Sequence, residues 1–459
     1  QNKLPLFMTA TCKFAAFDDP EKVSAGEYLL LNNNGGAIAL LTTTRLVYSV
    51  PNYNLNKNFI NVLYEKQNGN YPRLGDLYKQ TKVLSGSGSN TRNFILLGDP
   101  ALSLAYPKYN VSTTSISDTI KALQTVTVSG EITDDNGLVL DDFNGVLTPT
   151  IFDKEIISYT LGQESCSPMP YKNQTSILYK GEVSVNAGEF SFSFVVPKDI
   201  DNNFANGKIS YYAQNSFYED ASGYDDSFVI GGVAENIAYD YDSPVISLFI
   251  NNRNFIDGGI TNSNPLLIVD VEDISGINTV GNGIGHDITA ILDNNSTTPF
   301  ILNEYYKSDL DNFRKGTVEF PFNDLSNGEH SVTFKIWDVF NNSSEKTINF
   351  LVTDDGIATI SDFLNYPNPF SNGTDFYFQN NQAGQVMDIN IQIYTVTGRL
   401  VKTINESFYN DGFRVGPISW DGKSSNGENL SAGLYIANLN INLENGKFET
   451  KSIRIAITP

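Results

Sequence analysis

The sequence is poor in the residues that carry acid–base and redox chemistry near neutral pH. Two histidines, two cysteines and three methionines occur among 459 residues. The cysteines, Cys12 and Cys166, lie about 150 residues apart and in different predicted domains, so we do not expect a structural disulfide between them. A thiol nucleophile needs a base, usually a histidine, and this sequence offers only His286 and His330.

Positive charge is also scarce. Lys and Arg number 30 against 52 Asp and Glu, which gives a net charge of −22. This balance excludes a nucleic-acid partner, because phosphates require a basic footprint. It also disfavours direct binding to anionic lipid and fits an extracytoplasmic or cell-surface protein.

Long apolar runs and a targeting segment are missing as well. No apolar run reaches the ~20 residues of a membrane helix. The chain begins at Gln1, with neither a methionine nor a basic segment followed by an apolar one. We therefore expect either a mature product or a fragment of a longer protein.

The first part of the chain, residues 1–110, has the pattern of an α/β domain. Short apolar runs of the buried-strand type occur at 4–10, 35–44 and 93–102. Between them, 54–67 places Phe59, Ile60 and Leu63 on one helical face, and 73–84 does the same with Leu74, Leu77, Tyr78 and Val83. Buried strands alternating with amphipathic helices predict a parallel sheet covered by helices.

The remaining residues alternate apolar and polar positions, which is the pattern of half-buried strands. Turn sequences such as "DDNG" and "NAG" separate these strands. The spacing predicts three β-sandwich (Ig-like) domains at 111–235, 236–355 and 356–459. The chain is therefore expected to be multidomain, with one truncated α/β domain followed by three sandwiches.

Cys12 is the candidate catalytic residue. It lies where the apolar run "LPLFMTA" ends, and functional groups in open parallel sheets gather at the carboxyl ends of strands. The polar segment that follows is typical of a loop and would leave the sulfur accessible. The residues alone leave two interpretations open, a nucleophile or a packed small side chain.

A family resemblance favours the nucleophile. The segments "FMTATCKFAAFDDP" (7–20), "GEYLLLNNNGGAIALLTTTRLVY" (26–48) and "LLGDPAL" (96–102) resemble the end of the catalytic domain of gingipain-like (family C25) cysteine peptidases. The tail motifs "NYPNPF", "IYTVTGRLV" and "WDG" followed by "LSAGLY" resemble the C-terminal sorting domain of type IX secretion cargo. Together with the intervening sandwiches, they resemble the sortases of that secretion system.

The resemblance implies roles for particular residues and a caspase-like sheet for residues 1–110. Cys12 matches the nucleophile at a strand tip. Thr42, Thr43, Thr44 and Arg45 stand at the tip of the next strand and are candidates for the substrate pocket. The family's catalytic histidine lies in an upstream His-Gly segment, which this sequence lacks. We therefore expect this chain alone to be inactive.

The implied function is that of a cell-surface, outer-membrane-associated cysteine sortase. It would cleave the sorting domain from cargo through a thioester and attach the cargo to surface lipopolysaccharide. The implied partners are cargo C-terminal domains, an outer-membrane β-barrel anchor protein, lipopolysaccharide and the N-terminal part of the same protein. The alternatives are a gingipain-like secreted protease that is itself cargo, and a non-catalytic adhesin or scaffold.

No cofactor is expected for thiol chemistry of this kind. Two acidic stretches, 134–142 and 239–244, are candidates for binding Ca²⁺ through carboxylate oxygens. Neither has the spacing of an EF-hand loop, so solvated turns are the favoured interpretation. Cys166, next to two prolines, is interpreted as a free, non-catalytic thiol.

Overall fold

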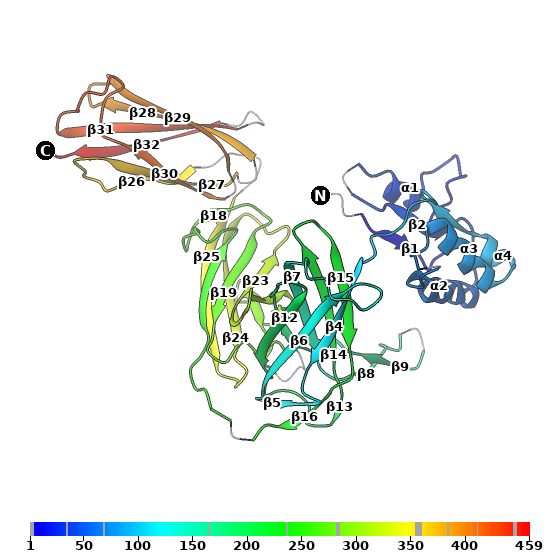
Figure 1. The fold of residues 1–459 in the computed structure, drawn as a ribbon. Coiled ribbons are helices and arrows are strands. Elements are labelled where there is room, and N and C mark those ends of the chain that lie inside the picture. Colours follow the sequence, from blue (N-terminus) through cyan, green and yellow to red (C-terminus); the bar gives the residue numbers. More distant parts are fainter. Residues whose placement is uncertain are drawn as a thin grey trace. The chain divides into compact units, whose positions relative to one another are not determined.

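The structure is a computed structural model. It describes residues 4–33, 35–67, 69–163, 166–235, 237–280, 285–353, 360–382, 385–410, 412–443 and 448–459. The chain divides into two compact units, Gln1–Pro107 and Lys108–Pro459 (Figure 1). The first unit is built around one apolar core and the second unit around three.

The first unit is a small sheet with four helices. Its strands are β1 (Leu6–Met8), β2 (Ala39–Thr43) and β3 (Phe94–Leu97). Its helices are α1 (Ala25–Leu30), α2 (Ser49–Leu63), α3 (Leu74–Ser85) and α4 (Ser89–Arg92). All five residues of β2 are buried, which explains why this strand is a continuous apolar and threonine run rather than an alternating one.

The sheet is mixed rather than wholly parallel. β1 pairs with β2 in parallel, with Leu6 opposite Ala39, whereas β3 runs antiparallel to β2, with Thr43 opposite Phe94. The prediction of a parallel sheet is therefore wrong for β3. An apolar run identifies a buried strand but carries no information on its direction, and mixed sheets with an antiparallel edge are common. Three strands are too few to define a caspase-like topology, which stays a prediction.

The helices bury only part of the predicted apolar faces. Phe59 and Leu63 of α2 and Leu77 of α3 are buried in the core of the unit. Ile60 is 55% exposed and Val83 is 72% exposed, so these two residues do not belong to the buried faces. Helical geometry explains both errors, because Ile60 follows the buried Phe59 by one position, a rotation of about 100°, and Val83 follows the buried Thr81 by two positions, a rotation of about 200°.

The first sandwich contains one large and one small sheet. The large sheet has the order β10-β7-β14-β15-β4-β6-β12, with β11 also paired to β7, and the small one has the order β13-β16-β5. Its core joins residues of both sheets, such as Val128 and Ile230. A separate hairpin, β8 (Ile156–Tyr159) with β9 (Pro170–Asn173), belongs to the same module. The strands of the two sheets are β4 (Tyr109–Ser115), β5 (Thr119–Ala122), β6 (Thr125–Thr133), β7 (Gly145–Phe152), β10 (Ile177–Lys180), β11 (Val183–Val185), β12 (Glu189–Val195), β13 (Ala205–Asn206), β14 (Lys208–Asn215), β15 (Asp220–Asp225) and β16 (Val229–Val233).

The second sandwich packs a four-stranded sheet, β17-β19-β23-β22, with a five-stranded sheet, β18-β25-β24-β20-β21. Alternation along β24 points Val332, Phe334 and Ile336 into the core, which is the period-two pattern of its sequence. The elements are β17 (Val245–Ile250), β18 (Ile260–Thr261), β19 (Leu266–Glu272), β20 (Thr289–Leu292), β21 (Phe300–Ile301), the 3₁₀ turn η1 (Asn303–Tyr305), β22 (Tyr306–Asp309), β23 (Asn312–Pro321), β24 (Gly328–Trp337) and β25 (Ser343–Val352).

The third sandwich contains a three-stranded sheet, β26-β27-β30, and a four-stranded sheet, β29-β28-β31-β32. Met387, Ile389, Ile391 and Ile393 alternate into its core from β28, and Trp420 is 3% exposed in the same core. The strands are β26 (Ile360–Tyr366), β27 (Thr374–Asn380), β28 (Gln385–Thr395), β29 (Leu400–Asn410), β30 (Arg414–Trp420), β31 (Gly433–Leu443) and β32 (Phe448–Ile457).

The first two sandwiches share a polar and apolar junction. Val280 of the second module packs into the core of the first. The carboxylate of Asp199 accepts hydrogen bonds from Asn278 Nδ2 at 2.9 Å and Asn341 Nδ2 at 2.7 Å, and it contacts His286 Nδ1 at 2.6 Å. These contacts make the two modules one continuous body.

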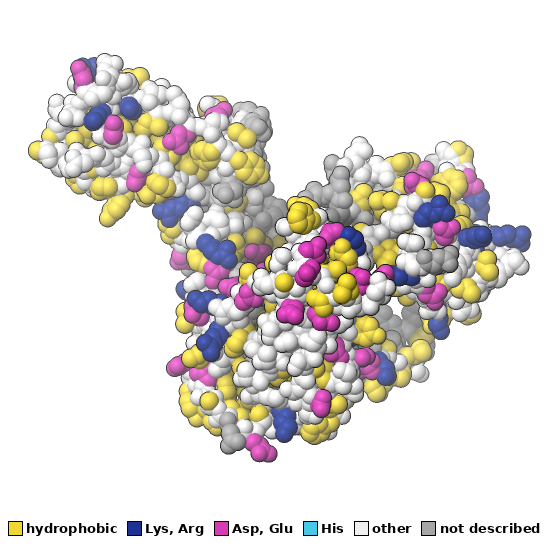
Figure 2. Space-filling model, in the orientation of Figure 1, with side chains coloured by type: hydrophobic (Ala, Val, Ile, Leu, Met, Phe, Trp, Pro, Cys, Tyr) yellow, Lys and Arg dark blue, Asp and Glu magenta, His cyan; other side chains and the backbone are white. Residues whose placement is uncertain are grey.

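Charge is distributed unevenly between the units. Residues 1–107 hold ten basic and seven acidic side chains, whereas residues 108–459 hold twenty basic and forty-five acidic ones. Acidic side chains are accordingly frequent over the sandwiches in Figure 2. In the described ranges, no helix is long and apolar enough to cross a membrane.

Candidate active site

Cys12 lies in the turn that follows β1, on the carboxyl-terminal side of the parallel β1–β2 pair. Its side chain is exposed and forms no disulfide. The next residue, Lys13, has a φ of 51°, a left-handed conformation that is uncommon for a residue other than glycine. Such local strain persists only where the surrounding structure holds it, and it is frequent at functional sites.

Main-chain groups of the segment after β2 hold the Cys12 sulfur in place. The Sγ–H donates to the Val47 carbonyl oxygen at 3.3 Å, and the Val47 N–H donates to Sγ at 3.4 Å. The Lys13 N–H donates to the Arg45 carbonyl oxygen at 3.4 Å. The turn is therefore fastened to the loop that leaves the neighbouring strand.

The threonines of β2 fasten the same turn through their side chains. Thr43 Oγ1 donates to the Thr11 carbonyl oxygen at 2.7 Å, and Thr42 Oγ1 bonds Thr9 Oγ1 at 2.8 Å. The Ala15 N–H donates to the Thr43 carbonyl oxygen at 3.0 Å. Thr9, Thr42 and Thr43 thus supply hydroxyl groups where the pairing of β1 with β2 ends.

Helix α1 closes the turn from the other side. The Gly26 N–H donates to the Phe14 carbonyl oxygen at 2.9 Å. A Cβ added at Gly26 would stand 2.5 Å from the Ala15 Cβ, a distance that real Cβ atoms do not adopt. Glycine is therefore needed here so that α1 can approach the chain that follows Cys12.

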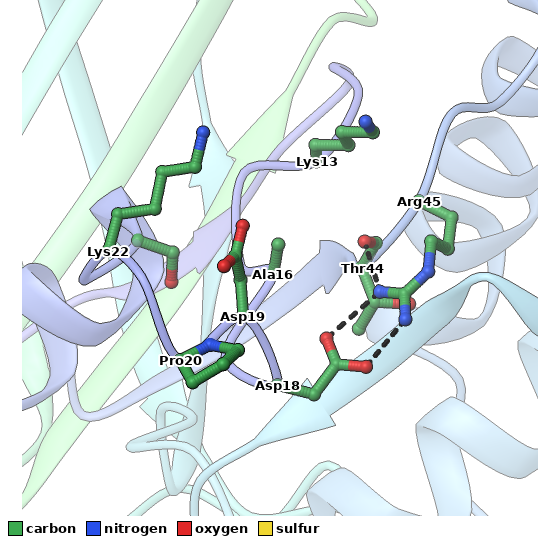
Figure 3. A pocket seen from close by; sticks show the side chains of 9 residues that line it. Lys13, Ala16, Asp18, Asp19, Pro20, Lys22, Thr44 and Arg45 are labelled. Carbon is green, nitrogen blue, oxygen red and sulfur yellow. Dashed lines mark hydrogen bonds and ion pairs between the residues drawn. The ribbon is translucent and has the colours of Figure 1, made fainter.

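A cavity of about 440 Å³ opens next to this turn (Figure 3). Its floor carries an ion pair between the Arg45 guanidinium and the Asp18 carboxylate, with distances of 2.9 and 2.5 Å. The hydrogen bonds from Arg45 hold the pKa of the Asp18 carboxyl below its usual value. The cavity is lined by Lys13, Ala16, Asp18, Asp19, Pro20, Lys22, Ser24, Thr44 and Arg45.

Two of the four predicted pocket residues line this cavity. Thr44 and Arg45 do so, whereas Thr42 and Thr43 are 0% exposed within β2. A fully buried side chain cannot contact a substrate, so the predicted pocket role is wrong for Thr42 and Thr43 in this structure. Their position in the strand interior makes them supports of the Cys12 turn. A substrate role for Thr44 and Arg45 stays a prediction.

The segment that carries Cys12 is similar to a known protein family. Residues 1–105 match the family model of peptidase family C25. We call these residues, which are similar to peptidase family C25, the C25 segment. The C25 segment covers the whole first unit up to Ala105 and ends before the sandwiches begin.

Solved structures were also compared with the chain. Dimeric latent PorU from Porphyromonas gingivalis is 27% identical, with 92% of this chain and 41% of that one covered and a TM-score of 0.35. A tetra-tandem repeat from the extending region of a large adhesion protein is 16% identical, covering 77% of this chain and 74% of that one, with a TM-score of 0.18. The chain thus spans 41% of the PorU chain that it matches. No curated protein matches the chain.

Neither histidine of this sequence lies in the C25 segment. His286 contacts Asp199 and packs against the Trp337 ring with centroids 4.4 Å apart. His330 bonds Asp293 Oδ2 at 2.8 Å and the Ser326 carbonyl oxygen at 2.7 Å. Both rings are engaged in polar contacts within the second unit, in agreement with their interpretation as residues of a sandwich.

We expect Thr43→Val to loosen the Cys12 turn. Valine has nearly the same shape but lacks the hydroxyl that bonds Thr11, so the protein should lose about 1 kcal/mol of unfolding free energy. The rate at which a thiol reagent modifies Cys12 should also change, because the turn that positions the sulfur is less fixed. Chemical denaturation and thiol labelling in a Cys166→Ala background measure the two effects. Equal stability and equal labelling rates would contradict the assigned role of Thr43.

A candidate metal centre lies in the second sandwich. Carboxylate oxygens of Asp240, Asp273 and Asp338 lie within 4.8 Å of one another. Asp273 and Asp338 are 5% and 0% exposed. Oxygen ligands of this kind suit a hard divalent cation such as Ca²⁺. Asp240 comes from the predicted acidic stretch 239–244, whereas 134–142 contributes no carboxylate to this cluster.

Crowding of these carboxylates changes their acidity. Burial raises the pKa of Asp273 to about 7, and the neighbouring charges of Asp338 and Asp240 act in the same direction. Burial also raises the pKa of Asp338. Two backbone N–H groups, of Ser275 and Gly276, donate to Asp273 Oδ1 and oppose the shift. Ca²⁺ binding stays a prediction.

The raised pKa of Asp273 predicts a pH-dependent stability. The folded protein binds the Asp273 proton more tightly than the unfolded chain does. The contribution of Asp273 to the free energy of unfolding therefore declines as pH rises from about 4 to about 7. Asp273→Asn keeps an oxygen for the two N–H donors and removes the charge. In EDTA at pH 8 the variant should be more stable than the wild type, by at most about 4 kcal/mol. At pH 4 the two should unfold alike in thermal melts, and the opposite order at pH 8 would contradict the prediction.

Sequence reasoning named Cys12 as a candidate but did not predict the contacts around its turn. The pairing of Arg45 with Asp18 joins residues 27 positions apart, and no periodicity connects them. Lys13 has a left-handed backbone conformation, but the position holds neither glycine nor asparagine, the residues that usually indicate one. The one available signal was the "TTT" run, since three hydroxyl side chains beside a buried strand need hydrogen-bond partners.

Proposed function

We propose that this chain is the C-terminal part of a cell-surface cysteine sortase of the type IX secretion system. The observation that carries the proposal is the exposed Cys12 thiol, held at the carboxyl end of β1 in a C25 segment beside the cavity lined by Thr44 and Arg45. The tail motifs are compatible with a sortase and with a secreted protease of the same system, and the resemblance of the intervening sandwiches to those of the sortases supports the first. The coarser assignment, chemistry of the cysteine-peptidase type, follows from the C25 segment.

The chemistry proceeds by nucleophilic catalysis in two steps. The Cys12 sulfur attacks the carbonyl carbon of a peptide bond at the sorting domain, and the C–N bond breaks as the new S–C bond forms a thioester. The leaving amine takes a proton from the general acid. An incoming amine then attacks the thioester, the S–C bond breaks, and a new amide joins cargo to its acceptor. Water in place of the amine would give hydrolysis.

The Cys12 N–H is placed to stabilise the negative charge that develops on the carbonyl oxygen of the substrate. The Cys12 N–H donates to no hydrogen-bond acceptor in the described part of the chain and follows a strand end. Such an N–H is available to bind the oxyanion of the tetrahedral intermediate. A second donor and the general base, a histidine, are assigned to the N-terminal part of the same protein.

The open edge of β1 supports the proposal that the active site is divided between this chain and an N-terminal part of the same protein. Within the described residues, β1 pairs only with β2, and its other edge has no strand partner. Leu4 is 37% exposed and Phe7 is 40% exposed near this edge. A further strand of a longer sheet would satisfy the edge and cover these side chains. We assign this strand to the N-terminal part, so the chain alone should lack activity.

The third sandwich, 356–459, is proposed as the address that places the enzyme at the outer membrane. By its tail motifs it would bind a β-barrel anchor protein on the extracellular face. Cargo C-terminal domains are the substrates and lipopolysaccharide is the acceptor in this proposal. Replacing Cys12 by alanine in the full-length protein, with cargo processing in cells as the readout, tests it.

A further inference from the structure

We propose that the outward face of the four-stranded sheet of the third sandwich binds a neutral oligosaccharide. The sheet has the order β29-β28-β31-β32 (Figure 1), and a groove of about 540 Å³ lies on it. This inference goes beyond the proposed function, because neither the Cys12 chemistry nor the sorting role enters it. The lining of the groove includes Asp388, Asn390, Asn405, Glu406, Asn440 and Asn442.

The alternation of buried residues in β28 shows which side chains face outward. Ile389 and Ile391 are buried in the core of the sandwich, so Asn390 between them points to the opposite face. Residues directly opposite each other on neighbouring strands share a face of the sheet. One outward row therefore crosses the whole sheet with one residue from each strand, namely Asn405, Asn390, Asn440 and Thr450.

Hydrogen bonds join the four side chains of this row. Thr450 Oγ1 donates to Asn440 Oδ1 at 2.9 Å, and Asn440 Nδ2 donates to Asn390 Oδ1 at 3.2 Å. Asn390 Nδ2 in turn donates to Asn405 Oδ1 at 2.6 Å. In the described part of the chain, neither Asn405 Nδ2 nor the Asn442 amide has a hydrogen-bond partner. The row is thus oriented by its own bonds and still offers polar groups to a ligand.

Amide side chains are unusual at the centre of a sheet. Asparagine and aspartate are depleted in strands, where β-branched and aromatic residues are preferred. Residues that break such a local preference are expected mainly at functional sites. The two central strands, β28 and β31, nevertheless place only amides and one acid at six consecutive outward positions, which are Asp388, Asn390, Gln392, Asn438, Asn440 and Asn442.

The chemistry of the groove identifies the class of ligand. A side-chain amide both donates and accepts hydrogen bonds, as each hydroxyl group of a sugar does. The residues that line the groove include Asp388 and Glu406 but neither lysine nor arginine, so sulfated, phosphorylated or uronic-acid sugars would be repelled. The volume lies within the roughly 300–1,000 Å³ that small-molecule sites occupy. A neutral saccharide meets all three conditions.

Two exposed aromatic rings stand on the same face, one on each edge strand. Phe448 of β32 lies opposite Asn442 and is 74% exposed. Tyr409 of β29 lies opposite Val386 of β28, two positions before Asp388, and is 63% exposed. An aromatic ring can stack on the C–H side of a sugar ring, which is apolar. A protein partner would instead require an apolar centre with a polar rim, the reverse of this arrangement.

The test uses the whole 459-residue chain, labelled with fluorescein, on an array of immobilised oligosaccharides. The neutral probes are built from hexoses, deoxyhexoses and N-acetylhexosamines, and the charged ones carry sulfate, phosphate or uronic acids. We expect saturable binding to neutral probes only. Isothermal titration calorimetry with the tightest neutral binder then gives Kd. Asn442→Ala and Phe448→Ala should each raise Kd at least fivefold, because each removes a group that contacts the ligand.

Matched controls are an exposed amide and an exposed phenylalanine away from the groove. Asn426→Ala, in the turn between β30 and β31, and Phe217→Ala, 80% exposed in the first sandwich, should change Kd less than twofold. Circular dichroism melts confirm that each variant is folded. The proposal is overturned by no saturable binding to any neutral probe or by a preference for charged probes. It is also overturned if Asn442→Ala and Phe448→Ala bind like the wild type or if the controls lose as much affinity as they do.

Discussion

Cells that carry Cys12→Ala in the full-length protein should accumulate cargo that retains its sorting domain and is not anchored at the surface. The variant removes the only cysteine in the C25 segment, and with it the thiol that forms the thioester in the proposed mechanism. Loss of a nucleophile lowers the turnover of such enzymes by ~10³-fold or more, because binding and oxyanion contacts alone give little covalent chemistry. This is the largest functional effect that we expect from one substitution in this chain.

Controls separate chemistry from folding. Cys12 is exposed, and alanine removes no buried contact, so the variant should be secreted and should melt within ~0.5 kcal/mol of the wild type. Cys166→Ala provides the matched thiol control and should process cargo normally, since Cys166 is also exposed and lies outside the C25 segment. Intact-mass analysis of the enzyme reports whether its own tail, 356–459, stays attached.

The outcomes distinguish the candidate functions. Normal cargo processing by Cys12→Ala would contradict both enzymatic proposals and favour a scaffold. A protein that loses its own tail on export, and whose Cys12→Ala variant leaves other cargo processed, would be a secreted protease of the gingipain type. Retention of the tail together with the failure of other cargo to mature is the result that the sortase proposal requires.

The β-rich modules could be predicted from the sequence because a half-buried strand records its environment at every second position. In β28, the buried residues Met387, Ile389, Ile391 and Ile393 are the apolar ones of an alternating run. In β24, the same rule identifies the core side chains. Alternation therefore fixes which face is buried, although it does not specify which strand pairs with which.

The predictions were wrong where strand direction or side-chain burial depends on contacts between residues far apart in the sequence. The direction of β3 depends on the path of three helices, which an apolar run does not encode. Ile60 is apolar and one residue from the buried Phe59, yet it faces outward because α2 carries apolar residues on both sides. Thr42 and Thr43 were assigned by position at a strand tip, whereas the strand continues through Thr43 and buries both side chains. Each error arose from a local pattern that two structures can share.

Asp199→Ala should separate the unfolding of the first two sandwiches. The Asp199 carboxylate joins them through Asn278 and Asn341 and contacts His286. Its side chain is 11% exposed, and the substitution leaves Asn341 Nδ2 without the acceptor that it has at 2.7 Å, whereas Asn278 Nδ2 keeps the Asn341 Oδ1 acceptor at 3.2 Å. Removing the acceptor of such hydrogen bonds costs about 1–3 kcal/mol, much of it from the donor that is left behind.

Differential scanning calorimetry measures this effect. We expect the wild-type sandwiches to unfold together and the variant to show two transitions, with the second module melting first because it contributes Asn341, whose Nδ2 loses its acceptor. Asp118→Ala is the matched control, since Asp118 is an exposed carboxylate of the first sandwich, and it should change stability by less than about 0.5 kcal/mol. A single unshifted transition in Asp199→Ala would show that apolar contacts such as Val280 suffice to join the modules. The carboxylate would then be a consequence of the junction rather than its cause.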